Sequence, residues 1–133
     1  IDVLVLNHGR YDRIDAKELE LEHLRRTMAT NFEGAFLVWD ATKSSLSENA
    51  RICVIGSQLG TRGSAHGADY SASKAALSIW ARSLAQSLAP EGKRVNVIAP
   101  GFVDTDILSG DSPQKRGKWT TPWITGCTTG LSW

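Results

Sequence analysis

The chain has 133 residues, of which 41% are hydrophobic and 22% are charged, and its 15 basic and 14 acidic residues give a net charge of +1. This composition is typical of one globular domain and excludes a disordered chain, and the lack of a basic stripe disfavours a nucleic-acid or anionic-membrane partner. Its apolar runs fall short of the roughly 20 residues of a membrane helix, and the two cysteines, Cys53 and Cys127, predict neither a disulfide scaffold nor a metal site, so we expect a reducing, cytoplasmic location.

Three short apolar runs predict strands, and amphipathic segments between them predict helices. The runs cover residues 3–6, 52–55 and 95–99. Because they do not alternate in polarity, we expect parallel strands buried on both faces. The helical patterns cover residues 15 to about 30, then 32 to about 46, and about 67 to 88. The order is βαβαβ, which predicts an α/β fold with a partial, Rossmann-like doubly wound parallel sheet that binds ligands at the carboxyl ends of its strands.

Tyr70 and Lys74 lie four residues apart at the start of the last predicted helix, a spacing that puts them on one face. An ammonium within about 4–6 Å lowers the pKa of a phenol by about 1–3 units. The pair therefore predicts a group that accepts and donates protons near neutral pH. The alternative is an ordinary pair of side chains on the surface of a helix.

Two further polar residues stand at sensitive positions. Ser57 follows the second predicted strand, where its hydroxyl can donate to a substrate oxygen, although a serine after glycine also commonly caps a turn. Asn31 interrupts a helical stretch, where its side chain competes for backbone hydrogen bonds and can kink the helix.

The segment from Tyr70 to Lys74, with Ser57 upstream, resembles the active site of the short-chain dehydrogenase/reductase family. Four further segments resemble the family's in the same order: residues 2–9, 31–34, 51–57 and 94–105. The resemblance covers about residues 1–108. It implies an incomplete dinucleotide-binding and catalytic domain over residues 1–108, followed by a lid-like, irregular C-terminal tail over residues 109–133, which show neither helical nor strand periodicity.

The resemblance implies a role for each matching residue. Tyr70 would be the general acid/base, Lys74 would lower its pKa and hold the nicotinamide ribose, and Ser57 would orient the substrate oxygen. Asn31 would hold a water of a proton relay. The cofactor-binding positions would be Asn7 and Gly9 at the adenosine ribose, with Tyr70 and Lys74, and Pro100, Gly101, Val103 and Thr105 at the nicotinamide. The reaction would be reversible hydride transfer between a small-molecule secondary alcohol or ketone and NAD or NADP.

The family's glycine-rich turn, which binds pyrophosphate at a helix N-terminus, has no counterpart in the sequence. We therefore expect a fragment of an oxidoreductase that begins mid-fold at Ile1, with a bare apolar sheet edge at residues 2–7. One alternative is a truncated, non-catalytic family member that acts as a binding or interaction protein, or an unstable fragment. Another is a related sugar-nucleotide epimerase, which shares the Tyr-x-x-x-Lys spacing.

The predicted helices at residues 31–47 and 67–88 resemble those that form the family's helical bundle between subunits. They predict a homodimer or homotetramer. One stripe of large apolar side chains on the second helix would serve either this interface or packing against the sheet. Its members are Leu77, Trp80, Leu84 and Leu88.

Overall fold

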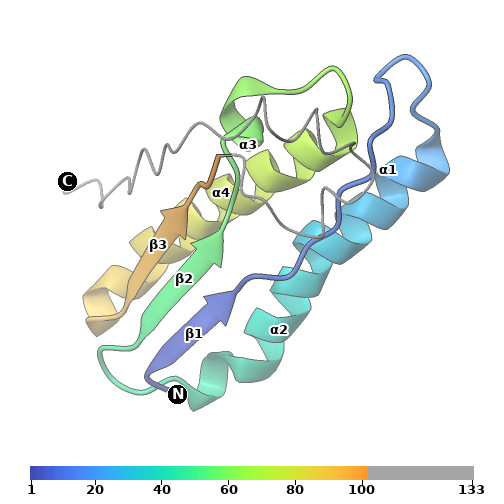
Figure 1. Ribbon diagram of the computed structural model, residues 1–133. Coiled ribbons are helices and arrows are strands. Elements are labelled where there is room, and N and C mark those ends of the chain that lie inside the picture. Colours follow the sequence, from blue (N-terminus) through green and yellow to red (C-terminus); the bar gives the residue numbers. More distant parts are fainter. Residues whose placement is uncertain (102–133) are drawn as a thin grey trace.

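A three-stranded parallel sheet forms the centre of the fold (Figure 1). The computed structural model describes residues 1–101, so the predicted tail lies outside the described residues. The strands are β1 (Val3–Leu6), β2 (Arg51–Ile55) and β3 (Arg94–Ile98), in the order β1-β2-β3. Both pairings are parallel, with Ile55 opposite Ile98 and Val54 opposite Leu6. The carboxyl ends of all three strands therefore meet at one edge, and the predicted α/β sheet is confirmed.

The helices form two long rods and several short turns. The first rod runs through α1 (Leu21–Met28), the π-helical turn η1 (Ala29–Glu33) and α2 (Gly34–Thr42), and ends in η2 (Lys43–Ser45). The second is α4 (Ala68–Leu88), followed by η3 (Ala89–Glu91). A short helix, α3 (Leu59–Arg62), lies between β2 and α4.

The first helix begins six residues later than the predicted start at residue 15. The Asp15 carboxylate accepts a hydrogen bond from the backbone N–H of Lys17 at 3.0 Å, which stabilises a local turn in place of a helix. The N–H of Ala16 donates to the carbonyl of Ala65 at 2.8 Å, a contact across fifty residues of sequence. The helix therefore begins later than its sequence pattern predicts, because the Asp15 side chain and the Ala16–Ala65 contact hold this segment in a turn.

The core lies between one face of the sheet and the two helical rods, α2 and α4 (Figure 1). Its buried apolar residues are Leu4, Leu6, Ile52 and Val54 from the strands and Ala35, Trp39, Leu77, Ala81 and Leu88 from the helices. Trp80 and Leu84 are partly buried and pack against this cluster. The apolar stripe of the last helix therefore packs against the sheet within this chain. Of the two predicted roles, a subunit interface or packing against the sheet, the structure shows the second.

The prediction that the strands are buried on both faces is wrong for the described residues. Val3 and Val5 are 62% and 53% exposed, and Ile98 is 42% exposed, whereas Leu4 and Leu6 are buried. The alternation arises because α2 and α4 cover one face of the sheet. The apolar edge expected at β1 is present in the described sheet, where β1 pairs with β2 alone.

Candidate active site

Ser57, Tyr70 and Lys74 come together at the carboxyl edge of the sheet. Ser57 follows β2, and Tyr70 and Lys74 lie in the first two turns of α4. The side chains of Ser57 and Tyr70 share a hydrogen bond. The Ser57 hydroxyl also accepts a bond from the backbone N–H of Leu59 at 3.2 Å, so its own proton is available for Tyr70. The turn contact predicted for Ser57 is thus present, whereas its predicted bond to a substrate oxygen stays a prediction.

Lys74 is buried, with 3% of its surface exposed. Its Nζ donates a hydrogen bond to the carbonyl of Ile55 at 2.9 Å and lies 5.8 Å from the centroid of the Tyr70 ring. Burial lowers the pKa of the Lys74 ammonium, because the charged form loses hydration. The predicted pairing on one helix face is confirmed, and a surface pair is excluded.

The predicted effect of this pair on the phenol is wrong in the described structure. Burial raises the pKa of the Tyr70 hydroxyl, and the hydrogen bond from Ser57 lowers it by a smaller amount. The ammonium of Lys74 points toward the Ile55 carbonyl, and it faces the ring of Tyr70 rather than bonding to its oxygen. Tyr70 is therefore held as a neutral phenol, which is the proton-donating form.

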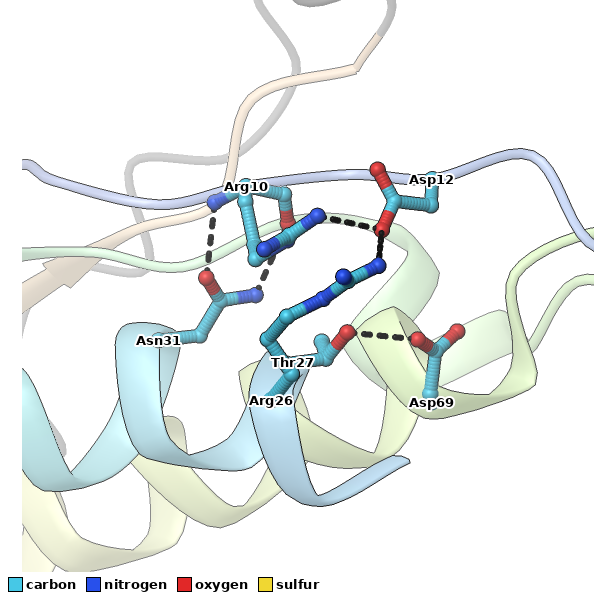
Figure 2. A network of polar contacts seen from close by, with 6 residues as sticks. All are labelled: Arg10, Asp12, Arg26, Thr27, Asn31 and Asp69. Atoms are coloured by element: carbon cyan, nitrogen blue, oxygen red, sulfur yellow. Dashed lines mark hydrogen bonds and ion pairs between the residues drawn. The ribbon is translucent and has the colours of Figure 1, made fainter. Parts of the chain in front are cut away.

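Asn31 lies in the middle of the π-helical turn and is fully buried. Its Oδ1 accepts a bond from the N–H of Arg10 at 2.7 Å, and its Nδ2 donates to the carbonyl of Arg10 at 3.0 Å (Figure 2). Nδ2 also donates a hydrogen bond to Ser73 Oγ at 2.9 Å. The Ser73 hydroxyl in turn donates a hydrogen bond to the backbone carbonyl of Tyr70 at 2.7 Å. Asn31 thereby joins the loop after β1 to the helix that carries Tyr70.

Gly9 lies in that loop, between Asn31 and Lys74. A Cβ atom added at Gly9 would be 3.3 Å from Lys74 Nζ and 3.5 Å from Asn31 Oδ1. Glycine therefore lets the loop approach the ammonium and the amide oxygen closely, where a side chain would crowd both groups. The neighbouring Asn7 is exposed at the end of β1. The predicted contacts of Asn7 and Gly9 with the adenosine ribose stay predictions.

The segment after β3 lies beside the end of β2. The carbonyl of Pro100 accepts a bond from the N–H of Gln58 at 3.0 Å, and the carbonyl of Ile98 accepts one from Gly56 at 2.8 Å. A Cβ added at Gly101 would lie 3.4 Å from Gln58 Oε1. Pro100 and Gly101 are thus at the same edge as the Tyr70 site, as expected. Val103 and Thr105, the other predicted nicotinamide contacts, lie outside the described residues.

A second polar network braces α1 against the site, and sequence reasoning missed it (Figure 2). The hydroxyl of Thr27 donates to Asp69 Oδ2 at 2.6 Å, and both residues are buried. Arg26 lies 3.3 Å from Asp12 Oδ2, which also binds Arg10 at 2.6 Å. The pattern of charges along each segment held no signal for these contacts, because the partners belong to different elements.

Two classes of site are not found in the part of the chain that is described. Residues 1–101 contain no group of three or more His, Cys, Asp or Glu side chains that could hold a metal ion. None of the helices described there is long and apolar enough to cross a membrane. The cytoplasmic location expected from the sequence stays a prediction.

An open parallel sheet flanked by helices, with serine, tyrosine and lysine at its carboxyl edge, is typical of the doubly wound α/β proteins, which bind ligands at that edge. Comparison with known families narrows the class of protein to one family, because the family model for short chain dehydrogenases matches residues 1–116. The chain belongs to the short-chain dehydrogenase family. The resemblance stated from the motifs is thereby confirmed.

Individual relatives agree with this assignment. The chain is 34% identical over 118 residues to the 3-oxoacyl-[acyl-carrier-protein] reductase FabG of Escherichia coli, a match that covers 87% of this chain and 48% of the relative. It is 35% identical over 109 residues to the 3-oxoacyl-[acyl-carrier-protein] reductase MabA of Mycobacterium tuberculosis, covering 80% and 44%. The chain thus spans about half the length of the curated relatives it matches.

A solved structure has the same arrangement of elements. A blue fluorescent protein from a metagenomic library, crystallised with NADPH, is 39% identical with a TM-score of 0.75, and the match covers 80% of this chain and 44% of that one. The described sheet and helices therefore correspond to a part of the dinucleotide-binding fold of this protein family.

Proposed function

We propose that this chain forms the proton-transfer and nicotinamide-facing part of an NAD- or NADP-dependent oxidoreductase that interconverts a secondary alcohol and a ketone. The observation that carries the proposal is the hydrogen bond between Ser57 and Tyr70 beside the buried ammonium of Lys74. The reductase names of the relatives and the NADPH in a similar solved structure support it.

In the direction of ketone reduction, Tyr70 donates a proton to the substrate oxygen. Its raised pKa keeps the phenol protonated at neutral pH, so the donor is ready in each cycle. When the substrate binds, the Ser57 hydroxyl turns its single proton from Tyr70 to the same oxygen and orients it toward Tyr70. When bound, the nicotinamide cofactor supplies the hydride. Alcohol oxidation requires Tyr70 as a base, and the hydrogen bond from Ser57 favours the tyrosinate form that this direction needs.

The residues around Gly9 are suited to a dinucleotide. Lys74 Nζ lies beside Gly9, and its ammonium has donors besides the one bound to Ile55 that can bind the hydroxyls of a ribose. Asn31 uses both protons of Nδ2 within the protein, and a remaining lone pair of Oδ1 can accept a bond from a relay water.

Turnover is measured in the longest native polypeptide that contains these residues, with NADH or NADPH and a panel of ketones that begins with 3-oxoacyl thioesters. Tyr70→Phe should lower kcat at least about a hundredfold, in line with the loss of a general acid, while cofactor binding is retained. Thr42→Val is the control, because its hydroxyl bonds to a helix carbonyl remote from the site. Unchanged turnover in the Tyr70→Phe chain would remove Tyr70 from the mechanism.

Cofactor binding separates this proposal from its alternatives. Fluorescence titration of NADH and NADPH is carried out on the 133-residue chain and on the longest native polypeptide. Binding without turnover on any alcohol or ketone would favour a non-catalytic binding protein. Turnover of a nucleotide sugar without net change in cofactor absorbance would favour an epimerase.

We also propose that two copies associate through α2 and α4. Phe36, Leu37 and Ile79 are 45%, 64% and 58% exposed, and the ring of Phe36 lies 6.2 Å from that of Trp80 on α4. Phe36 on α2 therefore lies beside α4, and each of the two helices carries exposed apolar side chains. In sedimentation velocity, Leu37→Glu should shift the chain toward the monomer, and an unchanged distribution would exclude Leu37 from an interface.

A further inference from the structure

Tyr11, in the loop after β1, packs directly against the proposed proton donor. The rings of Tyr11 and Tyr70 meet edge to face, with their centroids 5.1 Å apart and their planes at 77°. This geometry is the preferred one for aromatic pairs, because the positive edge of one ring meets the negative face of the other. Tyr11 is half-buried, so its ring covers part of Tyr70 without closing the site.

Tyr11 is itself held from the opposite side. Its hydroxyl donates a hydrogen bond to the carbonyl of His66 at 2.7 Å. A Cβ added at Gly67 would lie only 2.5 Å from Tyr11 Cε2, so the ring occupies the space that a side chain would need. A side chain at Gly67 would therefore have to displace the Tyr11 ring.

These contacts link the loop after β1 to the segment that leads into α4. The N–H of Ala16 donates to the carbonyl of Ala65 at 2.8 Å, close in sequence to the Tyr11 contact with His66. Gly67 precedes the first residue of α4, and Tyr70 stands in its first turn. A displacement of the Tyr11 ring would therefore move Tyr70 in two ways. One is the direct contact between the rings, and the other is the start of α4, which carries Tyr70.

We propose that Tyr11 is a positioning residue for Tyr70: its ring holds the Tyr70 phenol in the orientation that bonds Ser57 and shields it from water. The consequence for catalysis rests on the proposed function, whereas the contact and its effect on ionisation do not. Among residues 1–101, the groups that face Tyr70 are Lys74 from its own helix, the Ser57 hydroxyl from the end of β2, and Tyr11 from the loop after β1. The neighbouring Asp69 is engaged with Thr27.

The sequence contains two tyrosines, Tyr11 and Tyr70, so any substitution of Tyr11 leaves Tyr70 as the sole phenol. Tyrosinate absorbance, recorded immediately after alkaline pH jumps, then reports the pKa of Tyr70 without any turnover. Tyr11→Phe keeps the ring and should retain the raised pKa. Tyr11→Leu removes the aromatic edge, admits water, and should shift the pKa down toward the ordinary value of a tyrosine. Phe36→Leu in the Tyr11→Phe background is the control and should cause no shift.

A second variant tests the same contact without removing the ring. Gly67→Ala combined with Tyr11→Phe adds a methyl group that must displace the phenyl ring, and it should lower the pKa of Tyr70 relative to Tyr11→Phe alone. Circular dichroism verifies the fold of each chain. Equal pKa values of Tyr70 in the Tyr11→Phe chain and in a folded chain with the ring removed or displaced would overturn the proposal. Unfolding of both altered chains would also overturn it, because Tyr11 would then support the fold rather than position Tyr70.

Turnover separates the two proposals. If the pKa of Tyr70 responds as expected but Tyr70→Phe leaves turnover intact, the proposed function fails and the positioning contact stands. If Tyr70→Phe abolishes turnover but the pKa of Tyr70 is indifferent to Tyr11, the proposed function stands and the positioning role of Tyr11 fails.

Discussion

Replacing Asn31 with aspartate should destabilise the fold through its hydrogen bonds alone, since the two side chains are nearly the same in shape. Oδ1 would still accept the N–H of Arg10, but both Nδ2 donations, to the Arg10 carbonyl and to Ser73, would be lost. The Ser73 hydroxyl offers no replacement, because it donates its proton to the carbonyl of Tyr70. A carboxylate would therefore face the carbonyl oxygen of Arg10 with no proton between them.

The expected loss follows from these contacts. Two buried hydrogen bonds at about 0.5–1.5 kcal/mol each, with an added penalty of about 1–3 kcal/mol for a buried oxygen left unsatisfied, give roughly 2–6 kcal/mol. The free energy of unfolding of a typical domain is roughly 5–15 kcal/mol, so this loss is a large part of it. Protonation of the new carboxyl would restore one donor, so folding should raise its pKa above the value of about 3.9 in the unfolded chain. The folded state then binds more protons, and stability falls as the pH rises above about 4.

Urea unfolding followed by circular dichroism measures this effect at about pH 4 and about pH 7. The stability gap between the native chain and Asn31→Asp should be small at the acidic pH and should widen toward neutrality. Asn49→Asp is the matched control at an exposed position, where a change within about 0.5 kcal/mol is expected. A gap that is independent of pH, or equal to that of the control, would refute the assigned role of Asn31.

Three further substitutions test other parts of the structure. Gly60→Ala should lower stability by about 1–3 kcal/mol, because its Cβ would lie 2.9 Å from the backbone nitrogen of Ala75, which cannot move aside. Thermal unfolding measures this, and an unchanged Tm would contradict the close contact of α3 with α4. Thr27→Val should cost about 1–3 kcal/mol by leaving the buried carboxyl of Asp69 without its donor, whereas Thr27→Ser should be close to native in urea unfolding. A valine variant as stable as the serine variant would show that this hydrogen bond contributes nothing. Val5→Lys should reduce concentration-dependent light scattering, since it puts a charge on the half-exposed edge strand β1, and unchanged scattering would mean that this edge does not drive association.

The element order was predictable because the relevant signals are local. Apolar runs and helical periodicity lie within single segments, and they located all three strands and both helical rods. The four-residue spacing of Tyr70 and Lys74 is also local, so their shared helix face was predictable. The start of α1 was not, since it depends on the contact of Ala16 with Ala65, a residue distant in sequence. The burial of both faces of the sheet was overpredicted, because β1 alternates between buried and exposed residues.

The sequence by itself predicted the family, the parallel direction of the strands and the identity of the residues at the carboxyl edge. The tertiary structure alone decided how those residues behave. Burial raises the pKa of Tyr70, whereas the spacing of Tyr70 and Lys74 suggested the opposite direction. Asn31 proved to be a link between Arg10 and Ser73. The physical reason is the same in each case: hydration and hydrogen-bond partners depend on what other elements bring near a side chain, and one-dimensional patterns carry no record of those neighbours.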